Sequence, residues 1–427
     1  MATQVFIVGT QKKEDMANEY EVGSFLDPLV ILRGMIQGVQ NYGNAMGIPN
    51  FGGKVILHPK FFGKPLALGV CVGIGEKKYS RKGKPRKGDV AILIGGPTGR
   101  DGIHGATMSS AASSETMVKK EGTAVQIGDP YTERLMMEAT PELRPHLRAF
   151  GDLGSGGIAS CFGEMGEGVG IELDLANIPV KYEGLAPWEK LESESQERMG
   201  AAVAPTQIKK VISILKNHEV PFHVIGTFSG KKRFVVKHGA ETIVDLPYSW
   251  LENFPVPKKK VDQFFSDVSP VRLPPSVLER PLEETLLPML AQSNLADQSL
   301  FFRRWDSTVQ GRSVRESCAP FTNMPYDHGI VGGLRDPSAS SRRNGISLGM
   351  TERNAVTNGK RNNAITQVLS LTINPWWSGN PYNMARACVA GSVSKQIAAG
   401  VKRNKIVLCD NFYTPKSTPE SDFYLTE

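Results

Sequence analysis

Residues 95–110 read GGPTGRDGIHGATMSS, and they directly follow a short apolar run at residues 90–94. This order predicts a strand that ends in a glycine-rich turn. Such a turn brings backbone N–H groups close to an anionic ligand, because glycine has no Cβ to obstruct the approach. A glycine-rich surface loop that binds nothing explains the same residues equally well. His104 lies within the turn, but nothing in the sequence assigns it a partner for acid–base chemistry.

The chain has 427 residues, of which 40% are hydrophobic and 22% are charged. This length predicts two or three domains, and the composition is typical of a soluble globular protein. The net charge of +7 is drawn largely from one basic stretch, so it does not indicate a nucleic-acid partner. Five scattered cysteines, without C-x-x-C or H-E-x-x-H, argue against zinc and favour reduced thiols in the cytoplasm. No apolar run predicts a membrane span.

Two stretches divide the chain into segments. The basic loop EKKYSRKGKPRK at residues 76–87 predicts a solvated turn between domains, because charge runs with Gly and Pro seldom fold. A proline-rich stretch over residues 252–282 is typical of a surface linker. The predicted segments are therefore 1–85, 86–251, 252–282 and 283–427.

Strand and helix signals alternate along the chain, which predicts a combination of α+β and α/β domains. A helix is expected from Asp27, which caps its start, to Gly43 or Gly47. Further helices are expected at 130–140, 205–217, 282–294 and after residue 381. Strands are expected at 4–9, 54–57, 66–74, 90–94, 168–175, 222–227, 233–236, 367–373 and 405–409.

Acidic and amide side chains follow several of these elements. Asp152 precedes a turn rich in glycine and serine, where a carboxylate suits Mg²⁺ that bridges phosphates, although a helix N-cap is the plainer interpretation. The cluster ESESQER at 192–198 is either a ligand site or a solvated loop. Gln126 ends an extended piece, and Asp410 follows the last predicted strand. Because no nucleophile elbow, Walker motif or dinucleotide motif occurs, these sites favour phosphate and Mg²⁺ handling over covalent catalysis.

Six strings occur in an order and spacing that resemble phosphoribosylformylglycinamidine synthase, the synthetase of purine biosynthesis. They are NYGN (41–44), MGIPNFGG (46–53), GGPTGRDGIHGAT (95–107), AVQIGDP (124–130), GEMGEGVGIELDL (163–175) and SESQERM (193–199). The likeness is densest over residues 26–245. It resumes more weakly at 285–311, where WDSTVQG (305–311) is similar to an aromatic-Asp-x-x-Val-Gln-Gly signature, and at 374–413.

The resemblance implies the aminoimidazole ribonucleotide synthetase-like fold, with two tandem halves that each join an N-terminal α+β domain to a C-terminal α/β domain. On this pattern, residues 1–85 form the end of a first N-terminal-type domain and residues 86–251 a complete C-terminal-type domain. Residues 283–427 form the start of a second N-terminal-type domain. We therefore expect a central portion of the family pattern, truncated at both ends.

The resemblance also implies an ATP- and Mg²⁺-dependent C–N ligase of the cytoplasm. Phosphoryl transfer activates the amide oxygen of formylglycinamide ribonucleotide, and ammonia then displaces the phosphate. A glutamine amidotransferase subunit is the implied source of ammonia, and a small bridging subunit is a further candidate partner. Neither nucleic acid nor a membrane is implied.

Site residues are carried over position by position from the resemblance. Asp152 is similar to a magnesium ligand of the family, and Asp410, in Asp-Asn-Phe, to an aspartate that binds the nucleotide. The substrate-binding positions of the family correspond to Gln126, Glu194, Ser195 and Gln196.

Several features depart from the family pattern. No His-Asn-His-Pro string occurs in the 427 residues, and the catalytic histidine it supplies would lie before residue 1. We therefore assign no catalytic residue and expect little activity from this chain alone. Pro97 stands where arginine is usual, and residues 335–364 fit poorly. A non-catalytic remnant or scaffold of the same fold remains an alternative, as does a related ATP-dependent synthetase, against which the strings at 124–130 and 193–199 argue.

Overall fold

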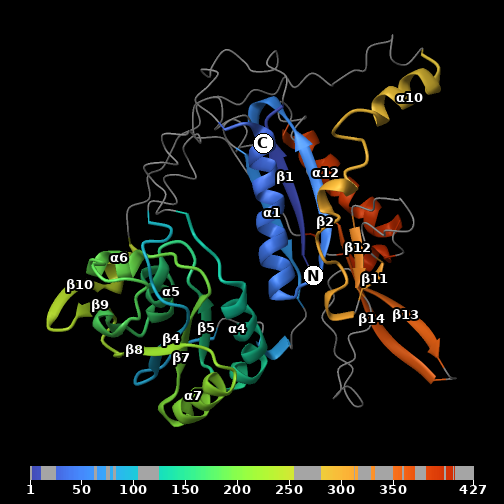
Figure 1. Cartoon of the computed structure of the whole chain (residues 1–427). Coiled ribbons are helices and arrows are strands. Elements are labelled where there is room, and N and C mark those ends of the chain that lie inside the picture. Colours follow the sequence, from blue (N-terminus) through green and yellow to red (C-terminus); the bar gives the residue numbers. More distant parts are fainter. Residues whose placement is uncertain are drawn as a thin grey trace. The chain divides into compact units, whose positions relative to one another are not determined.

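Figure 1 shows the chain as a computed structural model, which divides into two compact units. Unit 1 comprises Met1–Gly73 and Lys258–Glu427, and unit 2 comprises Ile74–Pro257. The structure describes residues 2–10, 26–61, 65–73, 77–79, 83–103, 125–253, 280–311, 313–315, 328–331, 350–357, 360–370, 381–398, 401–406 and 408.

Unit 2 is built on a seven-stranded mixed sheet with the order β10-β9-β6-β8-β4-β7-β5. Neighbouring strands are antiparallel, except for the parallel pair β6 and β9. The strands are β4 (Val90–Gly95), β5 (Ala149–Asp152), β6 (Ile171–Asp174), β7 (Arg198–Val203), β8 (Phe222–Thr227), β9 (Arg233–His238) and β10 (Glu241–Pro247).

Helices cover both faces of this sheet because its central strand is apolar on both sides. Successive side chains of a strand point to opposite faces. Ala91 and Leu93 of β4 pack into one core with α5 (Gly157–Gly166), whereas Ile92 and Ile94 pack into a second core. That second core includes side chains of α4 (Pro130–Leu143) and α7 (Ile208–Asn217). The apolar run at 90–94 therefore requires a layered α/β arrangement. The short helices α6 (Pro187–Glu192) and α8 (Tyr248–Glu252) complete unit 2.

Helix ends follow the capping signals of the sequence. Asp27 accepts a hydrogen bond from Leu29 N at 2.7 Å at the start of α1 (Pro28–Met46). Gly47 ends the helix in the left-handed conformation, with φ of 77°, which glycine adopts without a steric penalty. Asp129 caps α4 in the same way, by accepting from the amides of the first turn. The helix predicted from Asp27 is confirmed, and of the two predicted ends, Gly43 and Gly47, the structure has Gly47.

The first sheet of unit 1 has the order β2-β1-β3. The central strand β1 (Ala2–Val8) is parallel to β2 (Asn50–Leu57) and antiparallel to β3 (Leu66–Cys71). One face packs on Leu32 of α1 together with Phe302 and Trp305 from much later in the chain. The later elements are α10 (Leu282–Leu290), α11 (Ser299–Phe302), α12 (Pro381–Ala398) and an antiparallel sheet of β11 (Ser313–Arg315), β12 (His328–Val331), β14 (Lys360–Ser370) and β13 (Met350–Thr357).

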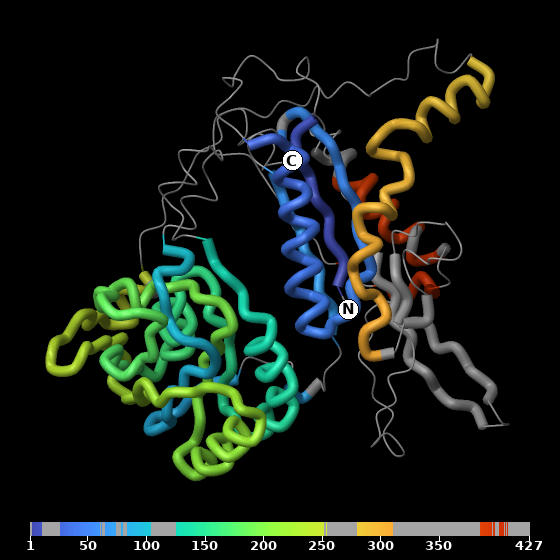
Figure 2. The backbone as a smooth tube through the Cα atoms, in the orientation of Figure 1, coloured from blue at the N-terminus to red at the C-terminus, as the bar shows by residue number. Residues whose placement is uncertain are grey.

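Residues 294–310 run along the open edge of β2 (Figure 2). The Gln298 amide accepts from Val55 N at 2.8 Å and donates to Val55 O at 2.7 Å. The Asn294 amide accepts from Leu57 N at 2.7 Å and donates to Leu57 O at 3.0 Å. Each side-chain amide thus replaces the neighbouring strand that an edge lacks. The Trp305 indole adds a bond to Ile36 O at 3.1 Å.

One expectation differs from the structure. The strand predicted at 405–409 is wrong for its described residues, because a 3₁₀ turn occupies Arg403–Lys405 and Ile406 and Leu408 are not in a strand. A short apolar run forms a strand only where a neighbour pairs with it. Part of the polar stretch 335–364, for which the sequence predicted no element, forms the hairpin of β13 and β14, with Met350 opposite Gln367. Among the described residues, no helix combines the length and apolarity that a bilayer crossing requires.

The edge contacts of Gln298 predict a measurable loss of stability. Gln298→Leu keeps most of the side-chain volume but leaves the buried N–H and C=O of Val55 without these partners. We expect unit 1 to lose roughly 2–4 kcal/mol of unfolding free energy, since each unpaired buried group costs about 1–3 kcal/mol. Urea titrations in which hydrogen exchange of the β1 and β2 amides is the readout measure this loss of unfolding free energy. The exposed Gln292→Leu is the control, and equal effects of the two variants would contradict the role of Gln298.

Candidate functional site

The glycine-rich loop and the acidic cluster emerge from the same end of two paired strands. β4 ends at Gly95, which lies opposite Arg198, the first residue of β7. The loop after β4 and the segment before β7 therefore meet at one edge of the sheet. Glu194 N donates to Asp101 O at 2.8 Å, which links the loop and the segment directly.

Side chains alternate along the segment before β7. Ser193 and Ser195 are completely buried, whereas Glu194 and Gln196 are half-buried. This period of two is typical of extended backbone. The alternation ends at Glu197, whose φ of 55° lies in the left-handed region that few non-glycine residues adopt.

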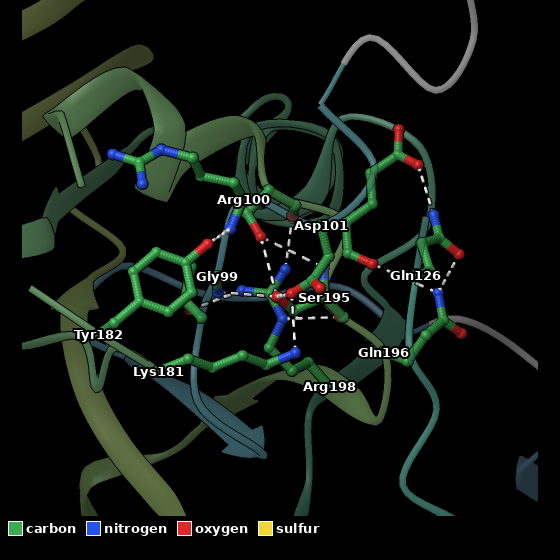
Figure 3. Close-up of polar contacts among 12 residues, drawn as sticks. Gly99, Arg100, Asp101, Gln126, Lys181, Tyr182, Ser195, Gln196 and Arg198 are labelled. Atoms are coloured by element: carbon green, nitrogen blue, oxygen red, sulfur yellow. Dashed lines mark hydrogen bonds and ion pairs between the residues drawn. The ribbon is translucent and has the colours of Figure 1, made fainter. Parts of the chain in front are cut away.

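The outward side chains of this segment meet Gln126, which arrives from a distant part of the chain (Figure 3). Gln126 Nε2 donates to Glu194 Oε2 at 2.7 Å, and Gln196 Nε2 donates to Gln126 Oε1 at 2.5 Å. The second oxygen of Glu194 accepts from Gly156 N at 3.4 Å, at the start of α5. We call Gln126, Glu194 and Gln196 the amide–carboxylate face. It joins residues that the sequence separates by about seventy positions.

The inward side chains form a second polar layer. The Ser195 hydroxyl donates to the Asp101 carboxylate and accepts from Gly99 N at 2.9 Å. Lys181 Nζ lies 2.8 Å from the same carboxylate. Burial alone would raise the pKa of Asp101, but hydrogen bonds from Lys181 and Ser195 outweigh it, so this pKa lies below its ordinary value.

Arg198 binds the backbone of the segment before β7 and a hydroxyl of the glycine-rich loop. Its guanidinium donates to Ser195 O at 2.9 Å, to Ser193 O at 2.5 Å and to Thr98 Oγ1 at 2.9 Å. Because the side chain is deeply buried, its pKa falls to about 10, so the group stays charged at neutral pH. A planar cation with several fixed donors suits such a set of carbonyl and hydroxyl acceptors.

Two glycines permit these close approaches. Gly102 has φ of 74°, and a Cβ added there would lie 2.3 Å from the Glu194 side chain. Gly157, at the start of α5, would place a Cβ 2.0 Å from Ser193 O. The glycine-rich composition of these turns therefore has a packing cause at these two positions.

The structure brings four predicted site residues together and places a fifth, Asp152, at the same edge of the sheet without a hydrogen bond to them among those described. Gln126, Glu194 and Gln196 form the face, and Ser195 lies directly beneath it. Asp152 ends β5 opposite Met199, and its side chain is exposed. The part of the chain that the structure describes contains no group of three or more His, Cys, Asp or Glu side chains that could hold a metal. Asp410 and His104 lie outside the described residues.

Sequence reasoning missed the residues that hold the face in place, which are Asp101, Lys181 and Arg198. Asp101 and Arg198 lay within quoted motifs, yet no spacing rule connects them, since about a hundred residues separate the partners. Lys181 carries no sequence signal. Arg100, the other charged residue of the loop, is bound elsewhere, to Glu189 at 2.7 Å.

Comparison with known proteins identifies the family of the domain that contains this site. Residues 86–239 match the family model described as AIR synthase related protein, C-terminal domain. This match spans the residues of both polar layers. The fold class expected from the sequence, the aminoimidazole ribonucleotide synthetase-like combination of α+β and α/β domains, is confirmed.

Individual relatives of the chain carry the name of one enzyme subunit. Phosphoribosylformylglycinamidine synthase subunit PurL of Methanobrevibacter smithii is 31% identical over 391 residues, which cover 90% of this chain and 49% of that protein. The same subunit of Methanothermobacter thermautotrophicus is 35% identical over 288 residues, covering 66% and 39%. The resemblance to phosphoribosylformylglycinamidine synthase is therefore confirmed in sequence. This chain spans about half of the length of these relatives or less.

A solved structure agrees in fold. The structure of PurLQS from Thermotoga maritima superposes with a TM-score of 0.50 and 20% identity, over 78% of this chain and 49% of that one. This superposition shows a shared fold.

The lowered pKa of Asp101 predicts a pH dependence of stability. Since the pKa is lower in the folded state, the ionised carboxylate stabilises unit 2 at neutral pH, and this contribution is lost as the pH falls below about 4. We expect the difference in unfolding free energy between the parent and Asp101→Asn to shrink from pH 6 to pH 3. Urea titrations at several pH values measure it.

The control for this experiment is Asp245→Asn, which breaks an exposed ion pair with Arg233 at 2.6 Å. Exposed pairs contribute little, so the corresponding difference should be small at every pH. A constant parent-minus-variant difference for Asp101→Asn across the acid range would show that its carboxylate is not selectively stabilised in the folded state.

Proposed function

We propose that this chain carries ligand-binding parts of a phosphoribosylformylglycinamidine synthase, an ATP- and Mg²⁺-dependent C–N ligase of purine biosynthesis. The substrate would be formylglycinamide ribonucleotide, and a glutamine amidotransferase subunit would supply ammonia, with a small bridging subunit as a further candidate. The observation that carries the proposal is the convergence of Gln126, Glu194 and Gln196 on one face. These are three positions that the family resemblance assigns to substrate.

The hydrogen bonds within the face determine what it offers a ligand. The Gln196 amide donates to the Gln126 carbonyl, and the Gln126 amide donates to Glu194. Each primary amide has two N–H donors and one C=O acceptor, and a carboxylate oxygen accepts more than one bond. The face is therefore suited to a ligand with N–H or O–H donors, such as an amide and a ribose.

Asp152 fits a role as a single protein ligand of Mg²⁺. Magnesium usually keeps several waters and is bound through one or two carboxylates together with substrate phosphates. An exposed carboxylate at the end of β5 meets that requirement, and it lies at the sheet edge from which the face emerges. Bound Mg²⁺ and ATP would supply the phosphoryl group that activates the substrate amide. The proposed nucleotide contact at Asp410 rests on the resemblance alone.

A second candidate is a binding protein of the same fold without turnover. Its support is the lack of a His-Asn-His-Pro string in the 427 residues, because the family uses that histidine for acid–base chemistry. Both candidates predict ligand binding, and only turnover distinguishes them.

Calorimetric titration with formylglycinamide ribonucleotide tests the shared prediction. We expect the parent chain to bind, and Glu194→Gln to bind about tenfold more weakly, because hydrogen bonds to a charged group contribute about 1.5–3 kcal/mol. Lack of binding by a folded parent at millimolar substrate would refute the proposal. Mixing the chain with substrate, ATP, Mg²⁺ and ammonium then measures turnover, which we expect to be slight.

The role of Asp152 predicts a specific loss of magnesium dependence. Asp152→Asn removes the charge but not the shape of the side chain, so the circular dichroism spectrum should be unchanged. Titration of ATP with and without Mg²⁺ should show that the ion enhances binding by the parent and not by the variant. Asp174→Asn changes a carboxylate that caps Ala176 N at 2.9 Å instead, and it should retain the enhancement. The same enhancement in Asp152→Asn would exclude this residue as a ligand.

A further inference from the structure

Asp101 contacts the segment that carries the face at two successive residues. Its main-chain carbonyl accepts from Glu194 N at 2.8 Å, and its carboxylate accepts from the Ser195 hydroxyl. The glycine-rich loop therefore holds this segment through one residue, by both its main chain and its side chain. Figure 3 shows Asp101 and Ser195 together, with Lys181 extended towards them.

The Ser195 hydroxyl is enclosed by the protein. Ser195 is completely buried, and its Oγ contacts Gly99 N at 2.9 Å and Ser193 Oγ at 3.1 Å in addition to Asp101. These partners come from the loop and from the segment itself. The position of the hydroxyl thus fixes the segment relative to the loop, while the neighbouring side chains remain directed outward.

We propose that Asp101 is a positioning residue, which keeps Glu194 and Gln196 turned outward by binding Ser195 from within. This inference rests on the proposed function for the ligand of the face. Asp101 itself does not belong to the face, and it acts through Ser195 and the segment backbone.

The chemistry of the Asp101 carboxylate makes this contact selective. An ionised carboxylate only accepts hydrogen bonds. If the segment slipped by one residue, an outward side chain would exchange places with Ser195, because the side-chain period of extended backbone is two. A slip that turns Glu194 inward would set its carboxylate against the Asp101 carboxylate without a donor between them. The observed register instead places the Ser195 hydroxyl, which is a donor, against Asp101.

Two cations stabilise the Asp101 carboxylate beside the segment that carries Glu194. Lys181 Nζ lies 2.8 Å from the Asp101 carboxylate, and the buried Arg198 guanidinium holds Ser195 O at 2.9 Å. Without them, two acidic side chains on adjoining segments would repel each other in a poorly solvated region. Lys181 and Arg198 therefore allow Asp101 to hold a segment that carries its own negative charge.

Backbone hydrogen exchange measures this positioning without any ligand. In Asp101→Asn and in Ser195→Ala, we expect exchange to accelerate about tenfold at Gly99 and over residues 193–196, because a bond to a charged group is weakened or lost. Amides of α4 and α7 should accelerate less than those of residues 193–196, because they report only the change in the unfolding free energy of unit 2. Should Asp101→Asn fail to fold, Lys181→Met and Ser195→Ala test the same contact between Asp101 and Ser195.

A core variant separates positioning from general destabilisation. Val211→Ala removes buried methyl groups of α7 from the second core of unit 2, to which the glycine-rich loop and residues 193–196 do not belong. It should accelerate exchange throughout unit 2 without a maximum at residues 193–196. Unchanged exchange there in Asp101→Asn and Ser195→Ala, or an even increase like that of Val211→Ala, would overturn the inference.

Affinity for formylglycinamide ribonucleotide is the second measurement. We expect Asp101→Asn to bind about tenfold more weakly than the parent, and the charge-matched Asp174→Asn to bind as the parent does. Parental affinity in Asp101→Asn would also overturn the inference. If the folded parent does not bind this substrate, the proposed function fails, and the exchange experiment still decides whether Asp101 positions the segment.

Discussion

The guanidinium of Arg198 lies almost fully buried at the first residue of β7, where it binds three oxygen atoms from two loops. A buried cation is stable only if its donors are satisfied, since the desolvation of an ion is costly. Here the acceptors are the carbonyls of Ser193 and Ser195 and the hydroxyl of Thr98. The segment before β7 therefore turns these two carbonyls towards the guanidinium, while its extended backbone directs alternate side chains inward and outward.

The order of the strands places the Arg198 guanidinium between the loop that leaves β4 and the segment that enters β7. β4 and β7 are adjacent, so the loop that leaves β4 lies beside the segment that enters β7. β5 is the other neighbour of β7, and it brings Asp152 to the same edge. Three separate stretches thus reach the same edge of the sheet because their strands pair. The rigid sheet holds positions that loops alone would not hold.

In unit 1, side chains likewise bind backbone groups that have no partner strand. The edge of β2 is covered by amides of Asn294 and Gln298, which donate and accept as a strand would. The aromatic side chains that follow, Phe302 and Trp305, then complete the core beside α1. Two stretches far apart in sequence therefore share one small core, and neither stretch would bury its apolar surface by itself.

The sequence by itself determined the local elements and the chemistry of the face. Capping by Asp27 and the apolar run before the glycine-rich turn specify a helix and a strand, because these signals act between near neighbours. The residue types in the motifs around Gln126 and Glu194 specify a site made of amide and carboxylate side chains. Only the tertiary structure decided that Ser195 faces inward, and that Asp101, Lys181 and Arg198 hold it. Those contacts join residues separated by up to about a hundred positions, and strand pairing, which no local pattern encodes, brings them together.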